Sequence, residues 1–377
     1  MPDADRPVDP APIPYVNLSA QFEEEKDELL AVVTDALQRG DFIGGAAVHA
    51  LEHALALMHS AEEAVCLNSG TDALVLAMRA LGIGHGDEVI TPANSFIAST
   101  ASIVHVGARP VLVDVLPDQN IDPDMVAQAI TPRTRAIMPV HLTGRIADMD
   151  SILALAEKHG LLVIEDAAQA IGSLHRGRLA GTIGDVGCFS AHPLKNLNAC
   201  GDAGFLVTGR SDIAQRIRLL RNHGLADRNT VTEFGIVSRL DTLQASILLM
   251  RLKRLPQVTE RRRRNAALYR SLLAPEHVFI PTCLEHEFNT FHTFVVQVDQ
   301  RDALQNWLGE HGIGTAVHYP IPIHLQPASR SLGYKPGDFP VTEAQAKRIL
   351  TLPVNQYLSE ADVRRVAATV NAFYDRT

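Results

Sequence analysis

The sequence is poor in the features that mark membrane-spanning and nucleic-acid-binding proteins. It contains no run of about 18 consecutive apolar residues, so no segment is expected to cross a membrane. The 34 Lys and Arg residues are outnumbered by 43 Asp and Glu residues, which gives a net charge of −9. This balance offers no electrostatic basis for binding nucleic acid or an anionic membrane surface, and neither is expected as a partner.

Cysteine is also scarce, with Cys66, Cys188, Cys200 and Cys283 forming no C-x-x-C pair. This spacing argues against a disulfide framework and a structural zinc site, fits a reduced cytoplasm, and leads us to expect no metal. The acidic, proline-rich start MPDADRPVDPAPIP lacks the basic residues and apolar run of a signal peptide. We therefore expect residues 1–14 to form a flexible tail.

The sequence is rich in short β-branched runs that alternate with helical patterns between residues 64 and 210. The runs are AVCL, EVITP, PVLVDV, AIMPVHL, LLVIED, GCFSA and GFLVTG, separated by stretches such as TDALVLAMRALG and MDSILALAEKHG. This alternation predicts βαβ units around a mostly parallel sheet. Residues 17–40 precede it and predict a helix that ends at Gly40.

The C-terminal part of the chain has a different pattern. Residues 240–273 predict long helices rich in Leu and Arg, followed by a strand in HTFVVQVD and helices over 301–312 and 359–373. We therefore expect an α/β protein with a large domain over residues 15–245. A smaller C-terminal α/β domain is expected over residues 246–377.

Ligands of doubly wound sheets bind at the carboxyl ends of the strands, so functional residues are expected just after each strand. In LNSGTDAL, Ser69, Gly70 and Thr71 open a helix after the first strand. Their backbone N–H groups and hydroxyls suit a phosphate, although the same residues are common as a plain helix cap.

Two further strand ends carry ionisable side chains. LLVIEDAAQA ends with Glu165 and Asp166, followed by Gln169, and GCFSAHPLKN places Ser190 and Lys195 beyond another strand. Asp166 alone could be catalytic, bind a metal or form a structural ion pair. Lys195 alone could be an ordinary surface charge.

The three strand ends together match the requirements of pyridoxal 5′-phosphate (PLP). The cofactor needs a lysine for a Schiff base, a carboxylate for the pyridinium nitrogen and a helix N-terminus for the phosphate. Phe96 in TPANSFIAST adds a flat apolar partner for the ring. The combination therefore predicts a PLP site.

The sequence resembles the sugar aminotransferases of the DegT/DnrJ/EryC1/StrS family over residues 13–375. The similar stretches include IPYVNLSAQF, VHLTGRIADMD, VIEDAAQAIGS, CFSAHPLKNLNACGDAGFLVTG, SRLDTLQASIL and HYPIPIHLQPA. The resemblance implies the aspartate aminotransferase fold (fold type I), PLP as the cofactor, and a homodimer with its active sites at the subunit interface.

The resemblance also implies a role for each matching residue. Lys195 is the Schiff-base lysine and the acid/base of the proton shift, and Asp166 pairs with the pyridine nitrogen. Gln169 is expected to bond the ring hydroxyl and Phe96 to stack on the ring. The phosphate is expected to be held by Gly70, Thr71 and Ser190.

Substrate contacts are implied for three histidines, namely His141, His318 and His324, although the imidazole of His141 could equally be a packed hydrogen-bond partner. Relatives carry an Asn that reaches the partner subunit's phosphate where this chain has Val237. Ser238 or Arg239 is expected to make that contact instead. Ala203 also departs from the Gly of relatives and is expected only to shift the turn.

The function that the resemblance implies is PLP-dependent transamination of a keto sugar, linked to a nucleotide, with an amino acid such as glutamate as donor. The alternatives are a PLP-dependent sugar dehydratase and a non-catalytic regulatory homologue. Relatives that dehydrate place His where this chain has Lys195, which favours transamination. The sugar, the nucleotide and the choice between a 3-keto and a 4-keto group stay open.

Overall fold

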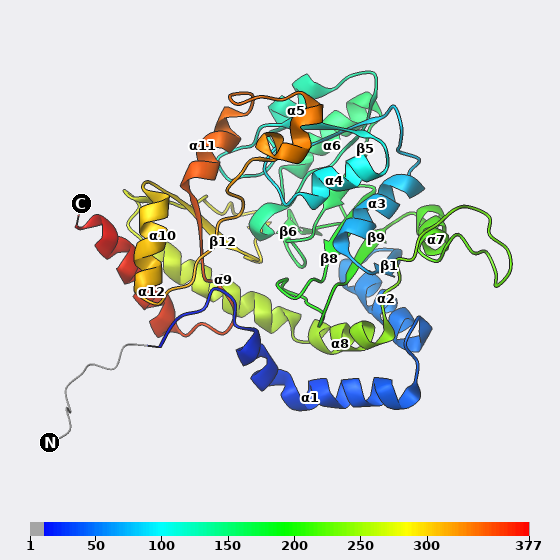
Figure 1. Cartoon of the computed structure of the whole chain (residues 1–377), viewed down its shortest axis with the longest axis horizontal. Coiled ribbons are helices and arrows are strands. Elements are labelled where there is room, and N and C mark those ends of the chain that lie inside the picture. The colour runs from blue at the N-terminus through cyan, green and yellow to red at the C-terminus, as the bar shows by residue number, and fades with distance from the viewer. Residues whose placement is uncertain (1–10, 377) are drawn as a thin grey trace.

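A computed structural model describes residues 11–376, and its centre is a seven-stranded sheet (Figure 1). The strand order is β1–β9–β8–β5–β4–β2–β3. The strands are β1 (Glu63–Leu67), β2 (Glu88–Pro92), β3 (Arg109–Val113), β4 (Thr134–Ile137), β5 (Leu162–Asp166), β8 (Val186–Ser190) and β9 (Gly204–Thr208). In this sheet β9 runs antiparallel to its neighbours β1 and β8, and the other paired strands run parallel. Each strand falls on one of the seven β-branched runs, so the predicted sheet is confirmed.

Helices cover both faces of this sheet because successive side chains on each strand point to opposite sides. On β1, Val65 and Leu67 belong to the core under α3 (Gly70–Ala80), α4 (Ala98–His105) and α7 (Ser211–Leu220). Ala64 and Cys66 belong to the opposite core. That core lies under α2 (Gly45–His59), α5 (Pro123–Ala129), α6 (Met149–His159) and α8 (Thr242–Leu252).

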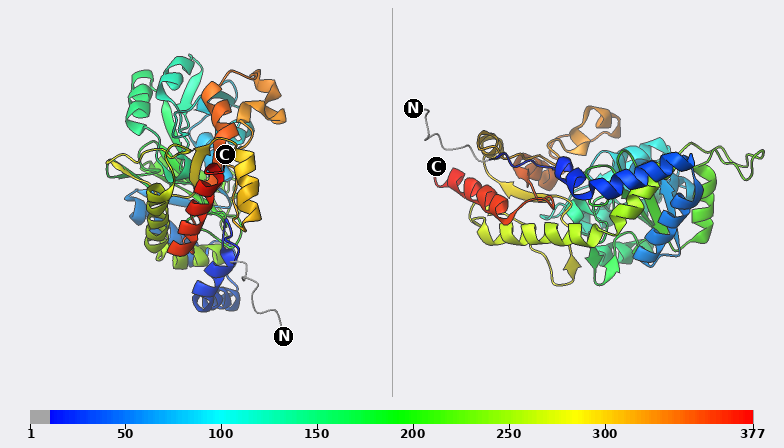
Figure 2. Two further views of the ribbon diagram at one scale, coloured as in Figure 1. Left: turned by 90° about the vertical axis from the view of Figure 1, so that its left-hand side faces the viewer. Right: turned by 90° about the horizontal axis from the view of Figure 1, so that it is seen from below.

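The first helix, α1 (Leu18–Arg39), lies beside α8 at the edge of the large domain, as two views show (Figures 1 and 2). Asn17 caps its start by accepting from the N–H of Ala20 at 3.0 Å. Gly40 ends it with a φ of 64°, a left-handed conformation that glycine adopts without strain. The helix predicted over residues 17–40 is therefore confirmed.

A second hydrophobic core forms the smaller domain. Its sheet has the order β10–β12–β13. The strands are β10 (Val278–Phe279), β12 (Phe294–Val298) and β13 (Ile349–Leu352), and the helices are α10 (Arg301–Glu310), α11 (Pro340–Arg348) and α12 (Glu360–Tyr374). The strand predicted in HTFVVQVD and the two predicted helices correspond to β12, α10 and α12.

Short elements connect these layers. A second three-stranded sheet has the order β11–β6–β7, from β11 (Glu287–Phe288), β6 (Leu174–His175) and β7 (Arg178–Leu179). Three 3₁₀ helices are η1 (Leu142–Gly144), η2 (Ile323–Leu325) and η3 (Pro327–Leu332). Within residues 11–376, no helix combines the length and apolar character that a membrane crossing requires.

The change from one core to the other occurs inside α9 (Leu255–Leu272). Leu255 packs in the large-domain core, whereas Ala266 and Tyr269 pack in the small-domain core. We therefore place the domain boundary within α9 rather than at residue 245, because α8 packs on the large domain.

The N-terminal segment also departs from the expected tail of residues 1–14. Residues 1–10 of that tail lie outside the described residues, but Ile13 is buried in the small-domain core. Its N–H donates to the carbonyl of Gly312 at 2.8 Å, and its carbonyl accepts from the N–H of Gly314 at 2.8 Å. The chain is therefore held by the small domain from Ile13 onward.

Candidate active site

A cavity of ≈ 380 Å³ lies at the carboxyl ends of the central strands. Asp166 is the last residue of β5 and Ser190 the last residue of β8, so the parallel pairing of these strands brings both side chains to the same edge. The residues predicted from sequence to bind the cofactor all line this cavity, namely Gly70, Thr71, Phe96, Asp166, Gln169, Ser190 and Lys195. His318 also lines it.

Asp166 supplies a buried carboxylate that forms no ion pair with the Lys195 amine, which acts on it only through space. It accepts from the Oγ of Ser99 at 2.7 Å and from the N–H of Ala168 at 3.2 Å, and it makes no ion pair within residues 11–376. A buried carboxylate without a cation is costly unless a bound group supplies the positive charge. The protonated nitrogen of a pyridine ring is such a group.

Glu165, the neighbour of Asp166 on β5, points to the other side of the sheet and is fully satisfied. It accepts from the Nε2 of His141 and from the N–H groups of Gly181, Ile183 and Gly184 at 2.6–2.7 Å. Burial opposes its ionisation, but His141 and the backbone donors outweigh burial and lower the pKa of Glu165. Of the two carboxylates, only Asp166 is left available to a ligand.

Lys195 follows β8 in a loop and projects into the cavity lining. Burial lowers the pKa of its amine to about 8, and the Asp166 carboxylate acts against this shift. With this pKa, about a tenth of the amine is uncharged at pH 7, far more than for an exposed lysine, and the uncharged form is the nucleophile and proton acceptor.

The phosphate end of the cavity is formed by the start of α3. Ser69 caps the helix by accepting from the N–H of Asp72 at 3.1 Å, which leaves the N–H groups of Gly70 and Thr71 at the cavity. A Cβ added at Gly70 would lie 2.8 Å from the Cβ of Ser190, so only glycine allows this close approach. The donors and the helix dipole together suit a phosphate.

A flat ligand in this cavity would also find an apolar side chain and an amide donor. The Phe96 ring is 56% exposed at the cavity, although a phenyl ring normally prefers burial. Gln169 accepts from the N–H of Thr143 at 2.8 Å and directs its amide donor toward the Tyr319 hydroxyl at 3.4 Å. A ring in this space would cover Phe96 and lie within reach of the Gln169 amide.

Several cavity residues were not predicted from the sequence, among them Ser99, His292 and Tyr319. Ser99, in the same SFIAST stretch as Phe96, could have been found from its place after a strand end. His292 and Tyr319 come from the small domain, and no local pattern places them beside Lys195. Burial and then the Lys195 charge lower the pKa of His292 and of His318, so both imidazoles are neutral at neutral pH.

Two of the predicted substrate contacts are not found. The side chain of His141 is fully enclosed, with its Nε2 2.7 Å from Glu165 and its Nδ1 accepting from the N–H of Ala147. The side chain of His324 is also enclosed, 2.9 Å from Glu343 and edge-on to Phe339. Neither imidazole lines the cavity, because each is packed in the protein interior.

The residues expected at the partner subunit are also partly engaged within the chain. Ser238 is fully buried and its Oγ contacts the backbone N–H and the side chain of Asn68, so its side chain is engaged within the chain. Arg239 is half-buried and donates to Asn222 at 3.2 Å. Val237 is half exposed.

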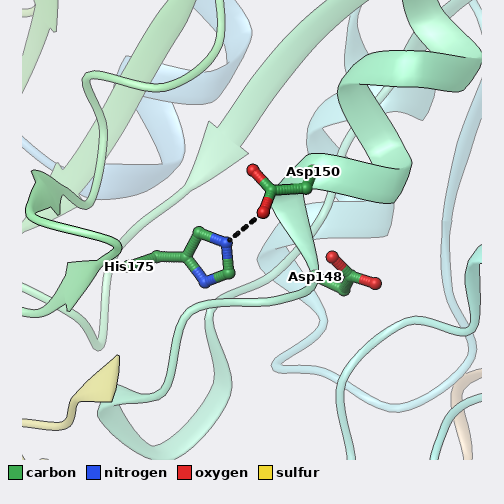
Figure 3. Close-up of side chains that lie close together, drawn as sticks. All are labelled: Asp148, Asp150 and His175. Carbon is green, nitrogen blue, oxygen red and sulfur yellow. Dashed lines mark hydrogen bonds and ion pairs between the residues drawn. The ribbon is translucent and has the colours of Figure 1, made fainter. Parts of the chain in front are cut away.

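Asp148, Asp150 and His175 lie close together outside the cavity (Figure 3). Asp150 already accepts from Arg176 at 2.6 Å, from Arg178 at 2.8 Å and from His175 at 3.2 Å. Two guanidinium groups thus neutralise the carboxylate that a metal would need. These contacts fasten β6 and β7 to α6.

The arrangement fits PLP at each of its functional ends and defines a PLP-dependent transferase of fold type I. A model of the DegT/DnrJ/EryC1/StrS aminotransferase family matches residues 23–371. The chain belongs to this family and is a PLP-dependent aminotransferase.

Individual relatives are similar over nearly their whole length. The pleiotropic regulatory protein of Geobacillus stearothermophilus is 41% identical, covering 96% of this chain and 98% of its own. The dTDP-3-amino-3,4,6-trideoxy-alpha-D-glucose transaminase of Streptomyces venezuelae is 40% identical, covering 97% of each. The crystal structure of S. venezuelae DesV in complex with a ketimine intermediate superposes with a TM-score of 0.95 at 40% identity. The superposition covers 98% of this chain and 100% of the DesV chain.

Replacing Asp166 by Asn should abolish most activity while leaving the fold intact. The amide has the same shape but cannot hold a proton on a pyridine nitrogen, and loss of such a preorganised charge costs about 10² or more in kcat. Steady-state kinetics and thermal unfolding of Asp166→Asn, with Ser99→Ala as a milder control, test this. A rate near that of the wild type would show that Asp166 is only structural.

The lowered pKa of the Lys195 amine should make this residue reactive at a lower pH than an exposed lysine. Its pKa of about 8 means that the amine is charged below this pH and neutral above it. In the cofactor-free protein, acylation of Lys195 should therefore rise with a midpoint near pH 8, whereas an ordinary lysine titrates near about 10.4. Mass spectrometry that compares Lys195 with the exposed Lys335 measures both, and equal midpoints would contradict the prediction.

Proposed function

We propose that the chain transfers an amino group from an amino acid, glutamate, to the 3-keto group of a nucleotide-linked sugar. The observation that carries this proposal is the buried Asp166 carboxylate without a cation in the same cavity as the partly uncharged Lys195. The name of the 40% identical S. venezuelae transaminase supports the sugar class and the C3 position.

The residues of this chain divide the work of the reaction. When bound, PLP supplies a ring that accepts electrons from the substrate carbon. Asp166 keeps a proton on the pyridine nitrogen, and the N–H groups of Gly70 and Thr71 bind the phosphate. The Lys195 amine takes the proton that the donor carbon loses and returns a proton to the acceptor carbon.

The rival functions are less well supported. A dehydratase of this family would carry His at position 195, and this chain carries Lys. The 41% identical relative is named as a regulatory protein. That name does not support a cofactor-free function for this chain, because the cavity keeps every group that PLP requires. A purely regulatory protein has no need of a buried amine beside a buried carboxylate.

The cavity also supports assembly with a second copy. Lys195 is its only Lys or Arg among the described residues, yet a cofactor phosphate, a glutamate carboxylate and a nucleotide diphosphate are all anionic. Exposed apolar side chains cluster along the chain at Leu30, Leu37, Phe42 and Ile43. We propose that this apolar stretch is covered in a homodimer, whose second copy supplies cations to the site.

A cytoplasmic location is part of the same proposal. Cys66, Cys188, Cys200 and Cys283 are all free thiols, and the last two are exposed. Exposed free thiols fit a reducing compartment.

An assay panel tests the proposed reaction. The wild type should aminate a dTDP- or UDP-linked 3-keto sugar with glutamate and act poorly on the 4-keto isomer, while Lys195→Ala should be inactive but folded. Borohydride reduction should attach the cofactor to Lys195 in the wild type. Preference for the 4-keto sugar would overturn the C3 assignment, and cofactor fixed at another lysine would overturn the role of Lys195.

The dimer is tested by placing charge on the apolar stretch. Leu37→Glu combined with Ile43→Glu should shift the protein from dimer to monomer in light scattering, because a buried unpaired carboxylate is costly. Activity should fall by about tenfold or more as the site loses its second copy. Phe279→Glu, at a 43% exposed position of the small domain, serves as the control. A fully active wild-type monomer would contradict the model.

A further inference from the structure

The loop that carries Lys195 is held from outside the cavity by two helices. The carbonyl of Ala191 accepts from the N–H of Ala199 at 2.7 Å, which closes the loop at its base. Within it, the N–H of Lys195 donates to the carbonyl of His192 at 2.8 Å, and Asn198 Nδ2 donates to the carbonyl of Pro193 at 2.7 Å. These internal bonds define the loop shape but do not fix the loop relative to the sheet.

Helix α1 fixes one side of the loop through Gln21. Its amide and that of Asn198 exchange two hydrogen bonds, each 3.0 Å long, and both side chains are more than 90% buried. The side-chain carbonyl and both amide hydrogens of Asn198 are then engaged, so its orientation is determined.

Helix α8 fixes the other side. Gln244 accepts from the N–H of Cys200 at 2.8 Å and donates to the carbonyl of Cys200 at 3.2 Å. Arg251 donates to the carbonyl of Asn198 at 2.8 Å and forms a buried ion pair with Glu25 of α1. Gln21 and Glu25 are four residues apart and therefore lie on the same face of α1.

The contacts of α1 and α8 with the lysine loop are polar, although an apolar contact would also join these helices. Further along α1, Leu29 packs against Ile247 and Met250 of α8, which shows that apolar side chains suffice to join the two helices. Replacing a buried ion pair by apolar residues is often neutral or stabilising, so such a pair is weak support for stability and can instead specify position. The polar contacts made by Gln21, Gln244 and Arg251 lie at the lysine loop. The ion pairs of Glu24 with Arg261 and of Glu28 with Arg254 lie outside it.

We infer that Gln21, Gln244 and Arg251 are positioning residues, which act through Asn198 and Cys200 to hold Lys195 at its place in the cavity. The inference rests on the proposed role of Lys195. It gives a function to the glutamines of AQF and TLQAS, two stretches that the cavity itself leaves unexplained.

The test compares Gln21→Ala and Gln244→Ala with the matched control Gln257→Ala. Gln257 is exposed on α9, at a cleft that Gln21, Asn198 and Arg251 also line. It makes no hydrogen bond to the loop. In the cofactor-free proteins, the pH midpoint for acylation of Lys195 should rise by about one unit in the first two variants, because a loosened loop admits water to the amine. In the loaded enzymes, kcat should fall by about tenfold while KM for glutamate changes little. Gln257→Ala should match the wild type in both.

A second variant separates position from stability. Glu25→Leu combined with Arg251→Met should keep or raise the unfolding temperature, since the apolar pair replaces a buried ion pair, and should still raise the Lys195 midpoint. Gln21→Glu and Gln244→Glu each keep one acceptor, so their Lys195 midpoint and kcat should lie between those of the wild type and the Ala variants. These variants test the inference if an Ala variant does not fold.

The inference is overturned if the midpoint and kcat of every variant that folds match those of Gln257→Ala. It is also overturned if kcat falls only in proportion to folded protein. These outcomes are distinct from failure of the proposed function, because the cofactor-free measurement follows Lys195 without any substrate. If borohydride fixed the cofactor to a lysine other than Lys195 in the wild type, the proposed function would be contradicted, but the acylation measurement on the loop would still be valid.

Discussion

The Asp166 carboxylate is the charge on which the rest of the site depends. It is buried at the end of β5, where only Ser99 and one backbone N–H satisfy it. The adjacent Glu165 shows what full satisfaction looks like in the same strand, with His141 and three backbone donors around it. The contrast between the two neighbours separates a structural carboxylate from one that is kept for a ligand.

Most of the fold is encoded in local patterns. The seven β-branched runs became the seven strands because their hydrophobic content suits burial on both faces of a parallel sheet. Asn17 and Gly40 mark the ends of α1 at the positions that capping chemistry dictates. The domain boundary was less accessible, because α9 is one continuous helix that packs in two cores and carries no break in its sequence.

The site was predictable only where it follows strand ends. Gly70 starts α3, Asp166 and Ser190 end β5 and β8, and Lys195 lies in the loop after β8; the resemblance to a family then gave them roles. His292 reaches the cavity through tertiary packing of the small domain, which no periodicity records. His141 and His324 failed as substrate contacts because a motif shows residue type but not whether Glu165 or Glu343 encloses it.

The charge of the cavity limits which ligands a single chain can neutralise. Among the described residues that line it, Asp166 and Asp202 are acidic and Lys195 is the single Lys or Arg, while burial keeps the histidines His292 and His318 neutral. A bound pyridinium would balance Asp166, but a phosphate would then add negative charge that the α3 N-terminus offsets only in part. An anionic sugar nucleotide and donor would add more. A single chain therefore provides the reacting groups but few cations for its anionic ligands.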